Sequence, residues 1–213
     1  MQNIKPLLSD QLRPKSFDCM ALNEKTINRL KYIVETGDMP NLLFHGAPGT
    51  GKTSSAELII NTLDCEFIEY NGSDRLGQKS LFQDIKKFCS GRSLWGKRKI
   101  VFIDECDYLL KATQAGLRRQ IETASQHDVR FIMTANETNR LIPAMLSRLT
   151  AIDFDASVRD RPEIIERVTK SIADRLVELD YNVEFQDIQK TVGIYYPDFR
   201  TIANKLELLS MAV

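Results

Sequence analysis

A glycine-rich segment that could bind phosphate lies between a short apolar run and a helical pattern. It has the spacing G-x-x-x-x-G-K-[ST] and comprises Gly46, Ala47, Pro48, Gly49, Thr50, Gly51, Lys52 and Thr53, with Ser54 next. Glycines let backbone N–H groups turn toward phosphate oxygens, and a helix that begins here adds the positive end of its dipole. With a lysine near the β- and γ-phosphates and a hydroxyl near Mg²⁺, the segment predicts a nucleotide phosphate site.

A pair of acids directly follows the apolar run Lys99–Ile103. The run predicts a strand, and carboxylates at its carboxyl end lie where ligands bind in parallel sheets. We expect Asp104 to hold Mg²⁺, directly or through a water molecule, and Glu105 to polarise an attacking water. A lone acid pair is often only a solvated strand end, but the phosphate loop favours the catalytic interpretation. Two roles stay open for Asp107: it caps the next segment, or it contacts a partner.

Three further side chains suit a phosphate site. Asn136 follows the apolar run Arg130–Thr134, where an amide can orient a water near the γ-phosphate, although Asn is equally a turn residue. Arg148 precedes the last apolar run, and Arg200 opens the final helical pattern. Because a guanidinium is planar and always charged, either arginine suits a developing phosphate charge; an ordinary surface role is the alternative for both.

The elements that must position these residues alternate between strand and helix. Short apolar runs predict five strands, at Asn41–Phe44, Phe67–Tyr70, Lys99–Ile103, Arg130–Thr134 and Ala151–Phe154. Helical patterns between them occupy Thr53–Leu63, Ser80–Cys89 and Thr113–Ala124. The alternation predicts an α/β fold built on a parallel sheet.

The pattern changes after about residue 155, where the strands stop. Three helical patterns follow, at Arg161–Leu179, at Phe185–Val192 and from Asp198 onward. They predict a small all-helical unit packed on the sheet domain, because a unit of this size is marginal alone. We therefore expect a nucleotide-binding domain over residues 1–155 and a helical lid domain over residues 156–213.

The composition is that of a soluble globular chain: 213 residues, 43% hydrophobic and 27% charged. Its 29 basic and 29 acidic residues cancel, so affinity for nucleic acid requires a local patch. The run Lys86–Lys99 has six basic residues and no acid, and it either attracts phosphates or forms a solvated face. No apolar run reaches the ~20 residues of a membrane span. The four cysteines form no C-x-x-C pair and do not have the spacing of a zinc site. This cysteine usage is what we expect of a protein in the reducing cytoplasm.

Seven motifs in fixed order resemble the AAA+ sliding-clamp loader ATPases, of the kind represented by the phage T4-type large subunit and the replication factor C small subunits. Besides the phosphate loop they are Leu12-Arg13-Pro14-Lys15-Ser16-Phe17, Asn71-Gly72-Ser73-Asp74, Asp104-Glu105-Cys106-Asp107, Thr134-Ala135-Asn136, Leu146-Ser147-Arg148 and Pro197-Asp198-Phe199-Arg200. The resemblance covers about Leu7 to Leu209 and implies a P-loop NTPase (AAA+) domain followed by a helical lid. The family's Ser-Arg-Cys reads Ser147-Arg148-Leu149 here, a departure that keeps the arginine.

The resemblance implies how the chain would bind ATP and Mg²⁺. Arg13 and Pro14 would lie against the adenine, and the phosphate loop through Ser54 would surround the phosphates. Lys52 would contact the phosphates, while Thr53 and Asp104 would hold Mg²⁺.

It also implies the catalytic residues, of which Lys52 is one. Glu105 would activate water, and Asn136 would be the sensor residue beside the γ-phosphate. Arg200 would reach the γ-phosphate of its own site from the lid, whereas Arg148 would be the finger that completes the site of a neighbouring subunit.

In this family ATP binding closes subunits into a spiral that opens a ring clamp and grips primer–template DNA by its backbone, and hydrolysis releases the clamp. The resemblance thus implies three partners: a sliding clamp, primer–template DNA, and other loader subunits or copies of this chain. It implies DNA contacts by Arg75 and Lys79. The implied location is the cytoplasm, which is the host cytoplasm for a phage protein, or the nucleus for a eukaryotic protein. Family members continue into a helical collar that this sequence lacks, so a truncated form, a collar from another chain and a different assembly all stay open.

Two other functions remain compatible with the motifs. One is a related AAA+ helicase loader or remodeller, and the other is a nucleotide-dependent binding module without turnover, which the intact Asp104-Glu105 pair disfavours. A GTPase is disfavoured because the sequence has no Asn-Lys-x-Asp element, and a small-molecule kinase is disfavoured because no mobile arginine-rich lid is recognisable.

Overall fold

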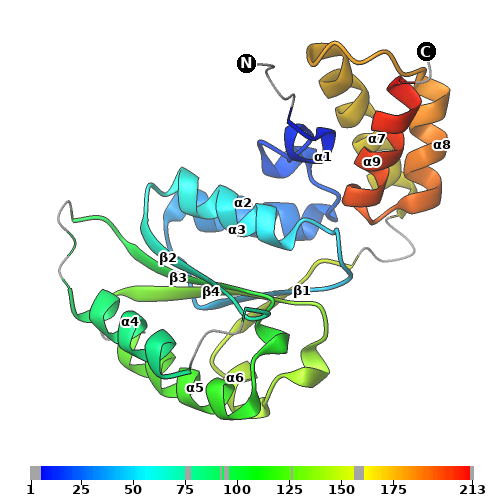
Figure 1. Ribbon diagram of the computed structural model, residues 1–213. Helices are drawn as coiled ribbons and strands as arrows, with labels where there is room; N and C mark the ends of the chain where they lie inside the picture. Colours follow the sequence, from blue (N-terminus) through cyan, green and yellow to red (C-terminus); the bar gives the residue numbers. More distant parts are fainter. Residues whose placement is uncertain are drawn as a thin grey trace, which may run out of the picture.

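The structure, a computed structural model, describes residues 6–74, 78–91, 93, 96–125, 127–155 and 161–211 (Figure 1). Its centre is a five-stranded parallel sheet in the order β2-β3-β4-β1-β5, as the strand–helix alternation predicts. The strands are β1 (Leu42–His45), β2 (Glu66–Asn71), β3 (Lys99–Asp104), β4 (Val129–Ala135) and β5 (Thr150–Asp153). All five predicted strands are confirmed, with ends that differ by at most one residue.

The strand order decides which loops meet. β1 lies between β4 and β5, and β3 lies between β2 and β4, so β1, β4 and β3 are consecutive. Their carboxyl ends therefore lie side by side, although the three strands are far apart in the sequence. The loop after β1 and the acids after β3 are brought to one edge of the sheet in this way.

Helices cover both faces of the sheet (Figure 1). On one face lie α2 (Glu24–Thr36) and α3 (Lys52–Thr62), whose buried residues form one core with Leu42, Phe44 and Phe102. On the other face lie α4 (Gln78–Ser90), α5 (Lys111–Ser125) and the short α6 (Pro143–Leu146), packed against Leu43 and Val101. The alternating burial of Leu42, Leu43 and Phe44 toward opposite cores explains why β1 is apolar throughout.

Helix α2 was not expected, because the strand–helix pattern begins only at Asn41. Its apolar residues Ile27, Leu30, Ile33 and Val34 are at helical spacing and pack into one core, so the sequence does carry a helical signal here. The ends carry signals as well: the Asn23 side chain accepts a hydrogen bond from the Thr26 N–H, and Gly37 ends the helix in the left-handed conformation.

Three helices form the carboxyl-terminal unit, as predicted: α7 (Arg161–Glu178), α8 (Phe185–Tyr195) and α9 (Phe199–Ser210). The amino-terminal helix α1 (Leu8–Gln11) joins them, because Leu8 is fully buried in the same core and α1 contacts α9 (Figure 1). Three short 3-10 turns complete the described elements: η1 (Phe17–Cys19), η2 (Cys106–Tyr108) and η3 (Thr138–Arg140). The limit between residues 155 and 156 stays a prediction, and residues 156–160 lie outside the described ranges. Within those ranges, no helix has the length and apolar character needed to cross a membrane.

Tyr196, just after α8, joins the lid to the amino-terminal segment. Its side chain is buried, and its hydroxyl donates to the carbonyl of Ala21 at 3.3 Å. Burial, opposed by the charges of Arg161 and Arg167, raises the pKa of Tyr196 to about 12. The folded chain thus favours the neutral phenol more strongly than the unfolded chain does.

Alkaline pH should therefore destabilise the fold through Tyr196. The stabilisation by the neutral Tyr196 phenol is complete below pH 10.0, the ordinary pKa of a tyrosine, and is lost as the pH rises through about 12, the pKa of Tyr196 in the folded chain. Tyr196→Phe should remove this part of the pH dependence. Urea unfolding of both proteins from about pH 8 to about pH 12 tests this, and parallel decline of the two curves would contradict it.

Candidate active site

The loop between β1 and α3 closes around the lysine side chain that begins α3. Gly46, Gly49 and Gly51 have φ values of 144°, 78° and 90°, a region that favours glycine. The Lys52 Nζ donates to the carbonyl oxygens of Gly46 and Ala47, each at 2.8 Å. Since Gly51 offers no side chain as a cap, the first N–H groups of α3 are left to bind an anion.

Lys52 is buried, at 7% exposed. Burial lowers the pKa of Lys52, while the carboxylates of Asp155 and Asp104 oppose that change. Asp155 also accepts a hydrogen bond from the Ala47 N–H at 2.7 Å, so it both fixes the loop and offsets the lysine charge. The sequence offered no signal for Asp155 beyond its place at the end of the last strand.

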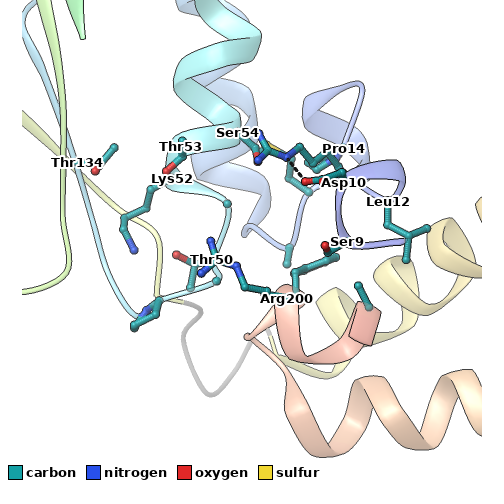
Figure 2. A pocket seen from close by; sticks show the side chains of 18 of the residues that line it. Ser9, Asp10, Leu12, Pro14, Thr50, Lys52, Thr53, Ser54, Thr134 and Arg200 are labelled. Atoms are coloured by element: carbon teal, nitrogen blue, oxygen red, sulfur yellow. Dashed lines mark ion pairs between the residues drawn. The ribbon is translucent and has the colours of Figure 1, made fainter. Parts of the chain in front are cut away.

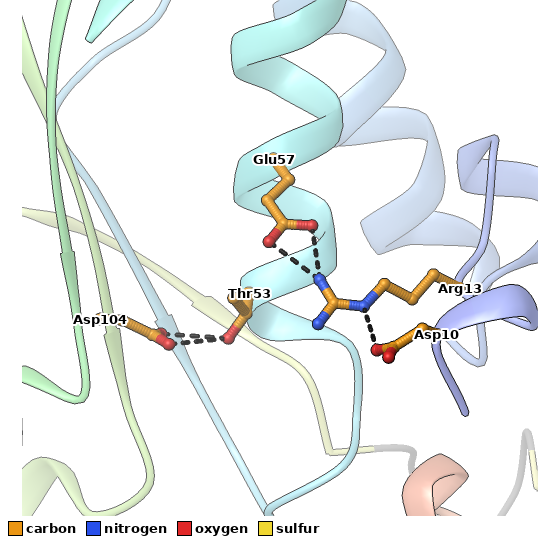
Figure 3. A network of polar contacts seen from close by, with 5 residues as sticks. All are labelled: Asp10, Arg13, Thr53, Glu57 and Asp104. Carbon is orange, nitrogen blue, oxygen red and sulfur yellow. Dashed lines mark hydrogen bonds and ion pairs between the residues drawn. The ribbon is translucent and has the colours of Figure 1, made fainter. Parts of the chain in front are cut away.

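Asp104 is held by two hydroxyl groups from neighbouring elements. The Thr53 hydroxyl donates to its Oδ1 at 3.0 Å and its Oδ2 at 3.2 Å (Figure 3), and the Thr134 hydroxyl donates to Oδ1. The Thr134 oxygen in turn accepts from the Glu105 N–H at 2.9 Å. Thr134 belongs to the motif Thr134-Ala135-Asn136, which by itself gives it no function; a hydroxyl residue directly after the buried apolar residues Phe131, Ile132 and Met133 is the signal that could have identified it.

The Thr53–Asp104 pair fits a Mg²⁺ site. Both supply oxygen ligands, which Mg²⁺ prefers, and Mg²⁺ is usually held by one or two carboxylates together with substrate phosphates. Among the described residues, no group of three or more His, Cys, Asp and Glu side chains could enclose a metal ion. A metal at Asp104 would therefore depend on the phosphates of a bound nucleotide.

Glu105 is aimed by an unusual backbone conformation. It has a φ of 52°, in the left-handed region that non-glycine residues rarely occupy and that is often found at functional sites. Gly72 supports the turn, because its N–H donates to the Asp104 carbonyl at 2.7 Å. A Cβ on Gly72 would come within 2.3 Å of the Glu105 carbonyl oxygen, so the Asn-Gly-Ser-Asp segment lies directly against the acid pair.

A cavity of about 320 Å³ collects most of the predicted site residues (Figure 2). Those in its wall are Arg13, Pro14, Pro48, Gly49, Thr50, Gly51, Lys52, Thr53, Ser54, Asp104, Glu105, Asn136 and Arg200. Gly46 and Ala47 lie outside its wall and act through their carbonyls on Lys52. Eight further residues line the same cavity without having been predicted as site residues: Ser9, Asp10, Leu12, Met20, Ala21, Thr134, Phe199 and Ala203.

Arg13 is held in place at the amino-terminal side of the cavity. Its guanidinium donates to both carboxylate oxygens of Glu57 on α3 at 3.0 Å and lies 3.6 Å from Asp10 (Figure 3). The segment before α2 is thus fixed to the helix that follows the phosphate loop. This contact joins Arg13, which lines the cavity, to the helix whose first residues line the same cavity.

The lid touches the phosphate loop directly. Asp198 caps α9 by accepting from the Thr201 N–H at 3.1 Å and lies against Gly49, whose added Cβ would stand 2.6 Å from Asp198 Oδ1. The Phe199 N–H donates to the Gly49 carbonyl at 3.3 Å. Arg200, the next residue, extends from α9 toward the phosphate loop (Figure 2).

Arg148 lies away from this cavity. Its Nε donates to Glu122 on α5 at 2.6 Å, and its Nη1 donates to the Ala144 carbonyl and the Ser147 hydroxyl at 2.8 and 2.7 Å. The guanidinium is therefore bound within its own chain, on a different surface from the cavity that holds Lys52 and Asp104.

The predicted DNA contacts are only partly described. Lys79 is exposed in the first turn of α4, and Arg75 lies outside the described residues. The basic run after residue 85 does not form one free surface: Lys97 pairs with Asp64 at 2.8 Å, and Lys99 is buried and donates to the Phe88 carbonyl.

Comparison with known proteins agrees with this arrangement. Residues 42–156 match the family model described as ATPase family associated with various cellular activities (AAA). Replication factor C subunit 3 of Blastobotrys adeninivorans is 37% identical over 196 residues, covering 87% of this chain and 58% of that protein. The replication factor C small subunit of Picrophilus torridus is 34% identical over 197 residues, covering 87% and 62%.

The structural comparison agrees in fold. RuvB of Thermotoga maritima superposes with a TM-score of 0.68 at 23% identity, covering 92% of this chain and 64% of that one. A likeness at this identity concerns the fold alone. The chain spans about three fifths of the length of the replication factor C relatives given above. From the matched family model and the sequence relatives together, the chain belongs to the AAA ATPase family and is related to the small subunits of replication factor C.

Proposed function

We propose that this chain is the ATP-binding and ATP-hydrolysing subunit of a DNA-polymerase sliding-clamp loader, which couples ATP to clamp opening and to clamp loading on primer–template DNA. The observation that carries the proposal is the single cavity shared by the phosphate loop, the acid pair, Asn136 and Arg200. The relation to replication factor C favours clamp loading over other AAA activities. The proposed partners are a sliding clamp, the backbone of primer–template DNA, and other loader subunits or copies of this chain.

ATP binding would use the loop as it is built. The free N–H groups at the start of α3 bind phosphate oxygens, and the Lys52 ammonium exchanges a loop carbonyl for a phosphate oxygen. Thr53 and Asp104 would hold Mg²⁺, which neutralises charge on the β- and γ-phosphates. Arg13 and Pro14 close the adenine side of the cavity.

Hydrolysis would use the groups at the ends of β3 and β4. Glu105 accepts a proton from water as the water oxygen attacks the γ-phosphorus, and the bond between that phosphorus and the bridging oxygen of ADP breaks. Asn136 orients the water from the carboxyl end of the neighbouring strand β4. Arg200 brings a positive charge from the lid to the γ-phosphate, so closure of the lid and stabilisation of the transition state are linked.

The site is completed by a second subunit in this proposal. Arg148 is bound to Glu122 of its own chain and is absent from its own cavity wall, which suits an arginine that acts on a neighbour. To reach the γ-phosphate in a neighbouring subunit, the Arg148 guanidinium leaves the Glu122 carboxylate and binds the phosphate instead. Turnover should then depend on assembly.

ATP turnover of the 213-residue chain, measured with and without clamp and primed DNA, tests the proposal. We expect stimulation by the partners, and Arg148→Ala should remove most of it, about tenfold or more, because an arginine finger is worth several orders of magnitude in related chemistry. ATP affinity should be unchanged, since Arg148 does not line the chain's own cavity.

Lys31→Ala is the matched control, because Lys31 forms a comparable ion pair with Asp18 on another surface. Full stimulation in Arg148→Ala would show that the finger assignment is wrong. ATP binding without turnover under any condition would instead favour the nucleotide-dependent binding module, and copurification with a helicase rather than a ring clamp would favour a helicase loader.

A further inference from the structure

Asp107 is a buried carboxylate that the proposed mechanism does not use. It lies in η2, three residues after Asp104, and is 5% exposed. Its Oδ2 accepts a hydrogen bond from the Glu137 N–H at 3.2 Å. Its Oδ1 is buried and has no hydrogen-bond partner among the described residues. A residue kept only for stability would not be expected to leave a carboxylate oxygen in this state.

The partner of Asp107 lies directly after Asn136. β4 ends at Ala135, and Glu137 has an extended backbone with a φ of −125° before η3 begins. The peptide that joins Asn136 to Glu137 therefore lies between two regular elements, where no strand ladder or helix supplies its acceptor. Asp107 supplies that acceptor from the neighbouring strand end.

Asn136 is thus bracketed by two contacts from one segment. Before it, the Thr134 hydroxyl joins Asp104 and the Glu105 N–H. After it, the Glu137 N–H joins Asp107. Both contacts come from residues 104–107, so the segment that carries the acid pair also holds Asn136 on either side.

We propose that Asp107 is a positioning residue for ATP hydrolysis: it fixes the Asn136 amide relative to the carboxylates of Asp104 and Glu105. This inference rests on the proposed function, since it assigns Asn136 to the reacting water. The carboxyl group suits the task because its oxygen accepts a hydrogen bond from the Glu137 N–H. Small displacements of positioned groups have large effects on rate.

The test compares Asp107→Ala with Asp107→Asn. The alanine variant loses the acceptor and should lower kcat about tenfold, with KM for ATP changed by less than about twofold, because the binding groups of the phosphate loop are untouched. The asparagine variant retains an oxygen that can accept from the Glu137 N–H, and it should recover most of the lost rate.

A second comparison asks whether Asp107 acts through Asn136. Asp107→Ala added to Asn136→Ala should cause no further loss of kcat, because the group that it positions is already gone. Cys106→Ala is the control for a general packing defect: Cys106 is also buried, and it should lose thermal stability without a selective fall in kcat. Additive losses in the double variant would overturn the inference.

Hydrogen exchange of the Glu137 amide gives a readout that does not require turnover. Exchange should be faster in Asp107→Ala than in the wild type and in Cys106→Ala, because only the first loses the acceptor. Unchanged exchange in Asp107→Ala would overturn the inference even if activity fell. If the wild type hydrolyses no ATP, the proposed function is refuted, and the exchange data still decide whether Asp107 holds this peptide. A kcat of Asn136→Ala equal to that of the wild type would refute both the function proposed for Asn136 and the inference about Asp107.

Discussion

Glu105→Gln should reduce ATP turnover by about 100-fold or more, because an amide cannot accept the proton of the attacking water and general-base catalysis contributes that much. The substitution keeps the size of the side chain and the left-handed turn that aims it. ATP should still bind, since the phosphate loop and the Thr53–Asp104 pair are intact. The measurement is kcat in the presence of primed DNA beside the affinity for ATP.

Glu69→Gln is the matched control for this experiment. Glu69 lies on β2, where partial burial and, after it, the charge of Asp104 raise its pKa, yet it does not line the cavity. Neutralising it should change the local charge and leave kcat within about twofold of the wild type, because surface charges act weakly through water. Equal losses in the two variants would mean that charge near the site, and not proton transfer by Glu105, sets the rate.

Gly49→Ala should weaken ATP binding by about tenfold or more, because a side chain at a positive φ and a displaced contact each cost about 1 kcal/mol or more. The backbone of Gly49 has a φ of 78°, and the added Cβ would lie 2.6 Å from the Asp198 Oδ1 and 2.9 Å from the Asp198 Cα. The second atom belongs to the backbone, so α9 must shift. The shift would move Arg200 away from the phosphate loop.

Gly96→Ala separates backbone strain from displacement of the lid. Gly96 also has a positive φ, of 67°, but no atom of the described residues lies within 4 Å of the position that its Cβ would take. Gly96→Ala should lower the stability of the fold through a similar backbone strain, without weakening ATP binding. Titration of both variants with ATP, together with thermal unfolding, distinguishes the two effects; wild-type affinity in Gly49→Ala would show that the lid contact plays no part in binding.

The strongly patterned parts of the fold were predictable from the sequence. The apolar runs around Val101 and Ile132 are long enough, and rich enough in β-branched residues, to identify strands that are buried on both faces. Helix α2 was missed although Ile27, Leu30 and Ile33 are at helical spacing, because it precedes the first predicted strand and lies outside the strand–helix alternation. A helix of this kind owes its stability to the sheet face that it covers, which is a tertiary property.

The candidate site divides along the same line. The phosphate loop and the acid pair could be identified because their chemistry depends on residue types at fixed local spacing. Thr134, Asp155 and Asp198 escaped because each acts on a residue that is distant in the sequence: Asp104, Ala47 and Gly49. A hydroxyl residue in a buried apolar strand marks Thr134 as a candidate, but no local pattern shows which distant residue any of the three contacts.

By itself, the sequence determined which residues can bind phosphate, hold Mg²⁺ and accept a proton, since these capacities belong to the side chains and to short backbone segments. Only the tertiary structure decided which of them work together. The order β2-β3-β4-β1-β5 places Thr53, Asp104 and Thr134 in contact, and the packing of α9 brings Arg200 to the loop while Arg148 stays with Glu122. The physical reason is that strand pairing and lid packing are set by burial of apolar surface summed over the whole chain, which no single motif contains.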